Sequence, residues 1–158
     1  MKKIIWRTVF FFLTLCTMAM IFYFSSENGE ESGAASDGVT AFFVRVFMGK
    51  ELSELSEKTL AALSFAIRKL AHFSEFFLLG LFSGGFIRTY KIKKWLYFAV
   101  PSAFCLALAA FDEFHQLFVS GRCGSVRDVM IDFAGALTAG LIMTIVCRAI
   151  RRGKGDKA

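Results

Sequence analysis

Four long apolar stretches alternate with polar segments along the chain, at residues 8–24, 70–87, 95–111 and 129–147. A helix that crosses a lipid bilayer needs about 20 mostly apolar residues, with a lower limit of about 17. All four stretches meet this limit. The pattern therefore predicts an all-α, polytopic membrane protein with four transmembrane helices, folded as a single membrane domain over residues 1–158.

The first stretch follows a basic N-terminus and so shares one feature with a signal peptide. Its apolar run is longer than the usual run of about 7–15 residues. It ends in Phe22-Tyr23-Phe24, which does not resemble a small-residue cleavage site. We therefore expect an uncleaved membrane anchor.

The polar segment at residues 25–66 contains an amphipathic pattern. Its large apolar residues recur at the spacing of one helix face, and they are Val39, Phe42, Phe43, Val46 and Phe47. Beside a membrane, such a helix is expected to lie flat in the interface or to cover the mouth of the bundle, with Ser36 or Asp37 as its cap. Ser56 is predicted to cap a second helix that continues directly into the second span.

Basic and acidic residues are separated along the chain. Twelve of the nineteen Lys and Arg residues lie in the N-terminal segment, in residues 88–94 and in the tail at residues 148–158. Seven of the thirteen carboxylates lie in residues 25–66, and one, Asp156, lies in the tail. Short cytoplasmic loops of membrane proteins are rich in Lys and Arg. The distribution predicts that both termini are cytoplasmic and that residues 25–66 and the loop after the third span face outside.

The composition agrees with a membrane location. The chain is 56% hydrophobic, compared with about 45–50% for a soluble domain. Its net charge of +6 comes from clusters beside apolar stretches, which is typical of contact with lipid headgroups and not of nucleic-acid binding. The four cysteines show no Cys-x-x-Cys or Cys/His ligand spacing, so neither a disulfide framework nor a zinc site is predicted.

Polar residues gather at the predicted outer ends of the last three spans. They are Arg68, Lys69, His72 and Glu75, then Asp112, Glu113 and Gln116, then Arg122, Asp128 and Asp132. An intramembrane acid costs about 2.5–3.5 kcal/mol at the helix centre, so it normally faces the bundle interior and has a partner. Together with Arg127, the basic residues carry +4 and the acids −5, which predicts mutual pairing around a water-filled, outward-facing pocket.

Residue type and spacing suggest chemical roles within this group. His72 and Glu75 are candidates for a general base and its orienting acid, with a packing role for the histidine as the alternative. The other eight residues are predicted to line the pocket or bind its ligand. Arg122 lies in a Gly-x-x-Gly turn that suits capture of a phosphate or carboxylate, and a snorkelling Arg is the alternative. A divalent metal held by His72, Glu75, Asp112 and Asp132 is chemically feasible. No tight ligand spacing demands one, so no metal or other cofactor is predicted.

The three motifs, R-K-x-x-H-x-x-E, D-E-x-x-Q-x-F-x-x-G-R and D-x-x-x-D-x-x-G, together resemble those of the VanZ-like family of small bacterial membrane proteins. Phe24-Ser25-Ser26 after the first span fits the same family, whereas Ser120 stands where proline is expected. The matching positions are Lys69, His72, Glu75, Asp112, Glu113, Gln116, Arg122, Asp128, Asp132 and Gly135. The founding member is linked to resistance to teicoplanin. The resemblance therefore implies a cell-envelope role in the bacterial cytoplasmic membrane, but it supplies no reaction.

The leading hypothesis is a pocket that binds or modifies an amphiphilic envelope ligand, such as a lipid-linked precursor or a lipoglycopeptide, and that contributes to glycopeptide tolerance. A second hypothesis is an intramembrane enzyme that acts on a lipid headgroup through His72 and Glu75. A third treats the charges as a structural ion-pair cluster without a ligand. A small transporter is disfavoured because four spans without a repeat offer little machinery for alternating access. Membrane lipids are the predicted partners, and the sequence leaves the catalytic status and the oligomeric state open.

Overall fold

The computed structural model describes residues 1–155, apart from the side chains of residues 151 and 153–155. Asp156 and the end of the predicted basic tail lie outside the described residues. Within residues 1–155 the chain is entirely helical, as predicted, with no strand. The α-helices are α1 (Lys2–Ser26), α2 (Gly29–Phe43), α3 (Glu57–Ile87), α4 (Leu96–Gln116) and α5 (Val126–Gly155). A π-helical turn, η1 (Val44–Met48), and a 3-10 turn, η2 (Leu52–Glu54), lie between α2 and α3.

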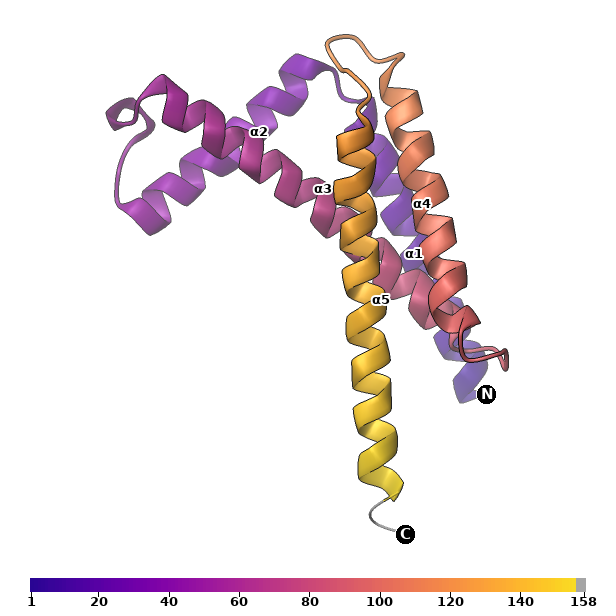
Figure 1. Cartoon of the computed structure of the whole chain (residues 1–158). Coiled ribbons are helices and arrows are strands. Elements are labelled where there is room, and N and C mark those ends of the chain that lie inside the picture. The colour runs from indigo at the N-terminus through magenta and orange to yellow at the C-terminus, as the bar shows by residue number, and fades with distance from the viewer. Residues whose placement is uncertain (156–158) are drawn as a thin grey trace.

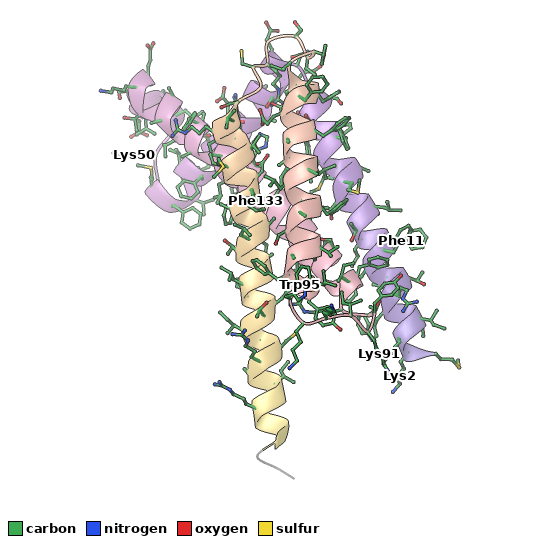
Figure 2. All side chains as sticks on the ribbon, turned by 45° about the vertical axis from the view of Figure 1, so that its right-hand side comes forward. Lys2, Phe11, Lys50, Lys91, Trp95 and Phe133 are labelled. Carbon is green, nitrogen blue, oxygen red and sulfur yellow. The ribbon has the colours of Figure 1, made fainter. Side chains whose placement is uncertain are left out.

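Four of these helices, α1, α3, α4 and α5, are long and apolar enough to cross a membrane, and each covers one predicted span to within one residue. The chain is thus a multi-pass membrane protein with four candidate spans. Both termini lie at one end of the bundle, and the loop between α4 and α5 lies at the other (Figure 1). Lys2 and Lys91 project near the N-terminal end, whereas Lys50 lies far from it (Figure 2).

The four long helices meet in a small apolar core. Ile21 of α1, Phe76 of α3, Cys105 of α4 and Ala136 of α5 are all buried in it. Many large apolar side chains point outward instead, including Phe11 of α1, which is 45% exposed. A protein in water rarely exposes apolar surface on this scale, so lipid is the solvent that these helices require.

The helices α3 and α5 cross at close range because small residues line their contact. A Cβ atom on Gly135 would meet the carbonyl oxygen of Phe73, and one on Gly80 would lie 2.9 Å from Cα of Ala136. Small residues let transmembrane backbones approach in this way. The crossing brings the polar end of α5 beside the polar face of α3.

An arm formed by α2 and the N-terminal half of α3 leaves the bundle sideways (Figure 1). The predicted cap of α2 at Ser36 or Asp37 is wrong, because the helix begins at Gly29 and its N-cap is Asn28. The side chain of Asn28 accepts from the backbone N–H of Glu31, and the side chain of Glu31 accepts from the backbone N–H of Asn28, which forms a capping box. The predicted cap of α3 is confirmed, since the Ser56 side chain accepts from the backbone N–H of Thr59.

The inward face of α2 consists of small polar residues. Ser32, Ser36 and Thr40 are buried at four-residue spacing. The hydroxyl of Thr40 lies 3.2 Å from that of Ser64 on α3. Most large apolar residues of the predicted amphipathic face point away from the protein, and Phe42 is 66% exposed, whereas Val39 at its start also lines a pocket. That this face lies in the membrane interface therefore stays a prediction, to which its exposed apolar side chains are suited.

Candidate functional site

A pocket of about 240 Å³ lies where the end of α1, α2 and α3 meet. Its apolar wall includes Ile21, Phe24, Val39 and Ile67. Its polar wall includes Glu27, Arg68, His72, Glu75, Asp112 and Arg122. The spacing of Arg68, His72 and Glu75 along α3 predicted that they share one helix face, and all three line this pocket.

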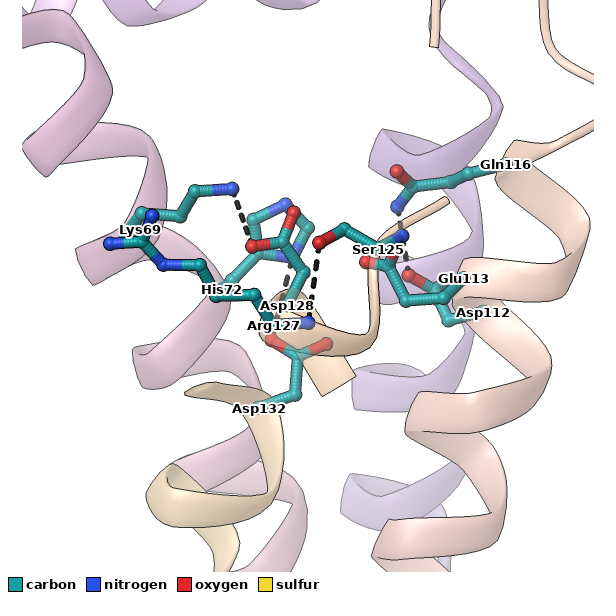
Figure 3. A network of polar contacts seen from close by, with 9 residues as sticks. All are labelled: Lys69, His72, Asp112, Glu113, Gln116, Ser125, Arg127, Asp128 and Asp132. Atoms are coloured by element: carbon teal, nitrogen blue, oxygen red, sulfur yellow. Dashed lines mark hydrogen bonds and ion pairs between the residues drawn. The ribbon is translucent and has the colours of Figure 1, made fainter. Parts of the chain in front are cut away.

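The end of α4 contributes Asp112, Glu113 and Gln116, which are all buried. The side-chain nitrogen of Gln116 donates to Oδ2 of Asp112 at 3.0 Å, as their four-residue spacing allows (Figure 3). Glu113 accepts from the backbone N–H of Ser125 at 2.7 Å, just before α5 begins. Glu113 therefore fixes the loop between α4 and α5, and it does not line the pocket.

An ion pair joins α3 to α5. Nζ of Lys69 lies 2.6 Å from Oδ1 of Asp128, and both side chains are mostly buried. Neither residue lines the pocket. One turn deeper on α5, Asp132 is fully buried, and its Oδ1 lies 3.6 Å from Nδ1 of His72 (Figure 3). That separation is too long for a hydrogen bond.

The side chain of Arg122 forms hydrogen bonds to the backbone of its own chain. Its guanidinium donates to the carbonyl oxygen of Phe24 at 2.8 Å and to that of Glu27 at 3.0 Å. These carbonyls end α1, where a helix favours a cation. Burial lowers the pKa of Arg122, and the charge of Arg68 acts in the same direction, but a guanidinium remains charged in proteins. The side chain of Arg122 also lines the pocket, so it can still reach a ligand there. Capture of a ligand anion by Arg122 therefore stays a prediction.

Unlike Arg122, Arg68 has no polar partner among the described residues. Among residues 1–155 its side chain makes no ion pair or hydrogen bond, and its Nε is buried without a partner. A buried donor is normally paired with an acceptor. Arg68 is thus the pocket cation that remains available to an anionic group.

The expected mutual neutralisation of the polar group is only partial. Within this group of charged residues, the structure pairs Lys69 with Asp128. Arg122 bonds to backbone oxygens, and Arg127 is exposed. In the described part of the chain, Oδ1 of Asp112 and both carboxylate oxygens of Asp132 are buried without a hydrogen-bond partner.

The candidate acid–base pair is not assembled by a hydrogen bond. His72 and Glu75 both line the pocket, but the described residues show no hydrogen bond between them. Nδ1 of His72 faces Asp132 instead. Catalytic hydrogen bonds often tighten only when substrate binds, so the catalytic role of this pair stays a prediction.

The sequence reasoning missed the contribution of α1. Ile21, Phe24 and Glu27 line the pocket, yet none was a candidate site residue. A signal for them existed, because Phe24 and the serines after it follow the first span at the same end of the bundle as the other motifs. The apolar character of Ile21 and Phe24 alone gave no reason to separate them from lipid-facing positions.

A family model described as VanZ/LLP1 matches residues 10–147, from the first candidate span to the fourth and across every residue that lines the pocket. No curated protein and no solved structure matches the chain.

Proposed function

Because the chain belongs to the VanZ/LLP1 family, we propose that it serves in the cell envelope by binding an amphiphile in the pocket between α1, α2 and α3. The proposed ligand class is a lipid-linked envelope precursor or an acylated glycopeptide such as teicoplanin. Binding of the latter would contribute to glycopeptide tolerance.

The observation that carries this proposal is the two-sided lining of the pocket. Phe24, Val39 and Ile67 offer an apolar surface, and Arg68 offers a cation without a partner among the described residues. A guanidinium binds carboxylates and phosphates through charge-assisted hydrogen bonds. The volume of about 240 Å³ is below the roughly 300–1,000 Å³ of typical small-molecule pockets, so it suits a headgroup while the acyl tail stays in lipid.

We also propose that the pocket faces outside and that both termini are cytoplasmic. The basic N-terminal segment and residues 88–94 lie at the end of the bundle opposite the loop between α4 and α5 (Figures 1 and 2). The positive-inside rule assigns that basic end to the cytoplasm. An outward pocket would meet ligands of the outer leaflet.

Binding is preferred to catalysis because no hydrogen bond among the described residues joins His72 to Glu75. The enzyme hypothesis predicts turnover of a headgroup-labelled lipid by the purified chain and loss of turnover in His72→Gln. The binding hypothesis requires neither result.

The test is tolerance in a glycopeptide-susceptible Gram-positive host that expresses the full chain. Expression should raise the inhibitory concentration of teicoplanin but not that of its deacylated core, because the acyl tail contributes to binding. Arg68→Gln and Glu75→Gln should each abolish the increase, since the first removes the unpaired cation and the second removes a carboxyl group from the pocket wall.

The matched controls are Arg127→Gln and Glu30→Gln, which change the same residue types at exposed positions outside the pocket. Both should retain tolerance. Immunoblots of membranes should give equal protein levels for all variants. Full tolerance in both pocket variants would contradict the proposal, as would equal protection against teicoplanin and its core.

A further inference from the structure

Three potential metal ligands meet beside the inner wall of the pocket. His72 of α3, Asp112 of α4 and Asp132 of α5 each offer one ligand atom, and these atoms lie within 4.8 Å of one another. Each residue comes from a different helix, so their spacing along the sequence gave no sign of the arrangement. His72 and Asp112 also line the pocket, which provides a route for an ion.

The carboxylates of this group are buried, and most of their oxygens have no hydrogen-bond partner. Asp132 is 0% exposed and Asp112 is 1% exposed. Within residues 1–155, both oxygens of Asp132, Oδ1 of Asp112 and Nδ1 of His72 have no hydrogen-bond partner. Burying polar atoms without partners is costly, and burying unpaired charges costs more. The hydroxyl of Ser25, which lies close to Asp112, can satisfy at most one of these atoms, so a bound ion, a water or a proton is needed for the others.

The basic side chains nearby are engaged elsewhere or do not reach the group. Lys69 pairs with Asp128, and Arg122 donates to backbone oxygens at the end of α1. In the described part of the chain, Asp132 forms no ion pair with a lysine or arginine. The group thus has two carboxylates and no protein cation bound to them.

A proton on one carboxylate would satisfy the group less completely than a metal ion. A single proton supplies one hydrogen bond, and four buried atoms need partners. A metal ion binds a neutral imidazole and two carboxylates together. Ligand atoms at about 2.0–2.2 Å from zinc lie roughly 3–3.5 Å apart, close to the 3.6 Å between Nδ1 of His72 and Oδ1 of Asp132.

We propose that His72, Asp112 and Asp132 bind one divalent transition-metal ion, Mn²⁺ or Zn²⁺, at the inner wall of the pocket. One nitrogen and two carboxylate ligands suit these ions, whereas Mg²⁺ and Ca²⁺ favour oxygen ligands alone. Gln116 donates to Oδ2 of Asp112, which holds this carboxylate in place and leaves Oδ1 for the metal. Three protein ligands leave a coordination position open toward the pocket.

The metal site stands independently of the proposed amphiphile, so its test uses metal alone. The full chain is purified in detergent, its affinity tag is removed, and bound metal is stripped with a chelator. Titration with Mn²⁺, followed by the electron paramagnetic resonance signal of free Mn²⁺, should give one saturable site per chain. Zn²⁺ should raise the Tm of the stripped protein.

Asp132→Asn removes the charge of one ligand with little change of side-chain shape, and His72→Gln removes the imidazole nitrogen. Loss of groups that merely orient a ligand costs about 10–100-fold in metal affinity, so loss of a ligand should weaken Mn²⁺ binding by at least about ten-fold. Zn²⁺ should no longer raise the Tm of either variant. Two variants on different helices keep the test decisive if one of them fails to fold.

His115→Gln and Asp37→Asn are the matched controls. Asp37 accepts a hydrogen bond from Ser64 in the arm, and His115 packs against Phe22 and is not one of the three grouped ligands. Both controls should bind Mn²⁺ as the wild type does. The proposal is overturned if the wild type shows no saturable site, or if Asp132→Asn and His72→Gln bind Mn²⁺ with wild-type affinity.

Discussion

Arg122 connects the loop between α4 and α5 to the end of α1 through two hydrogen bonds to backbone carbonyls. Hydrogen bonds from a charged group contribute about 1.5–3 kcal/mol when buried, and the partial exposure of Arg122 reduces this. We expect Arg122→Gln to lower the free energy of unfolding by about 1–2 kcal/mol. Arg122→Lys should fall between wild type and Arg122→Gln, because it keeps the charge but loses the fork.

Unfolding in mixed micelles with increasing sodium dodecyl sulfate, followed by circular dichroism, measures this effect. Arg127→Gln is the control, since Arg127 is exposed and its side chain forms no ion pair among the described residues. It should change the free energy of unfolding by less than about 0.5 kcal/mol. An equal loss in the two glutamine variants would show that the bonds to α1 add nothing to stability.

At the level of single residues, the sequence identified the polar group, but it did not predict which members bond to other parts of the chain and which stay without a partner. Spacing along one helix determines which side chains share a face, and it predicted the common face of Arg68, His72 and Glu75. Partners on other helices depend on how those helices cross, which spacing does not determine. The commitment of Arg122 to α1 and the lack of a partner for Arg68 within the described chain are facts of this second kind.

Among the elements, the crossing of α3 and α5 depends most directly on one residue. Gly135→Ala would place a methyl group against the carbonyl oxygen of Phe73, and forcing extra atoms into a packed contact costs about 1–3 kcal/mol. We expect Gly135→Ala to lower the Tm in detergent and to displace Asp132 from His72 on the same two helices. Loss of the proposed Mn²⁺ site should accompany the lower Tm.

Gly38→Ala is a control with the opposite expected sign. A Cβ on Gly38 of α2 would have nothing within 4 Å, and alanine favours a helix over glycine by about 0.8–1 kcal/mol. Gly38→Ala should therefore raise the Tm slightly. If both substitutions changed the Tm in the same direction and by the same amount, close backbone contact would not be the reason that position 135 requires glycine.

The helix α2 shows why the sequence pattern predicted the helices and their faces only in part. The large apolar residues after Val39 marked its outward face, but its inward face is built from Ser32, Ser36 and Thr40. The hydroxyls of Ser36 and Thr40 donate to carbonyls one turn earlier, so these side chains are buried as small, satisfied spacers. A search for apolar periodicity does not detect such a face. The capping box of Asn28 and Glu31 was the available signal for where α2 begins.

For the whole molecule, counting spans had more predictive power than any single motif. Four spans place the ends of the second and third polar motifs at one end of the bundle, and the structure brings Asp112 and Asp132 together there. What the count does not provide is the mutual rotation of the helices about their axes. That rotation determines that Glu113 supports the loop, whereas Asp112 faces the pocket.

The orientation of the whole molecule can be tested with a cysteine that the chain already carries. Cys123 is exposed in the loop between α4 and α5, and the other three cysteines lie within candidate spans, where a water-soluble reagent does not reach them. If the basic end is cytoplasmic, a membrane-impermeant maleimide should label Cys123 in intact cells, and Cys123→Ser should abolish labelling. In that background, Lys93→Cys should be labelled only after permeabilisation. The reverse pattern would place the pocket in the cytoplasmic half and exclude ligands of the outer leaflet.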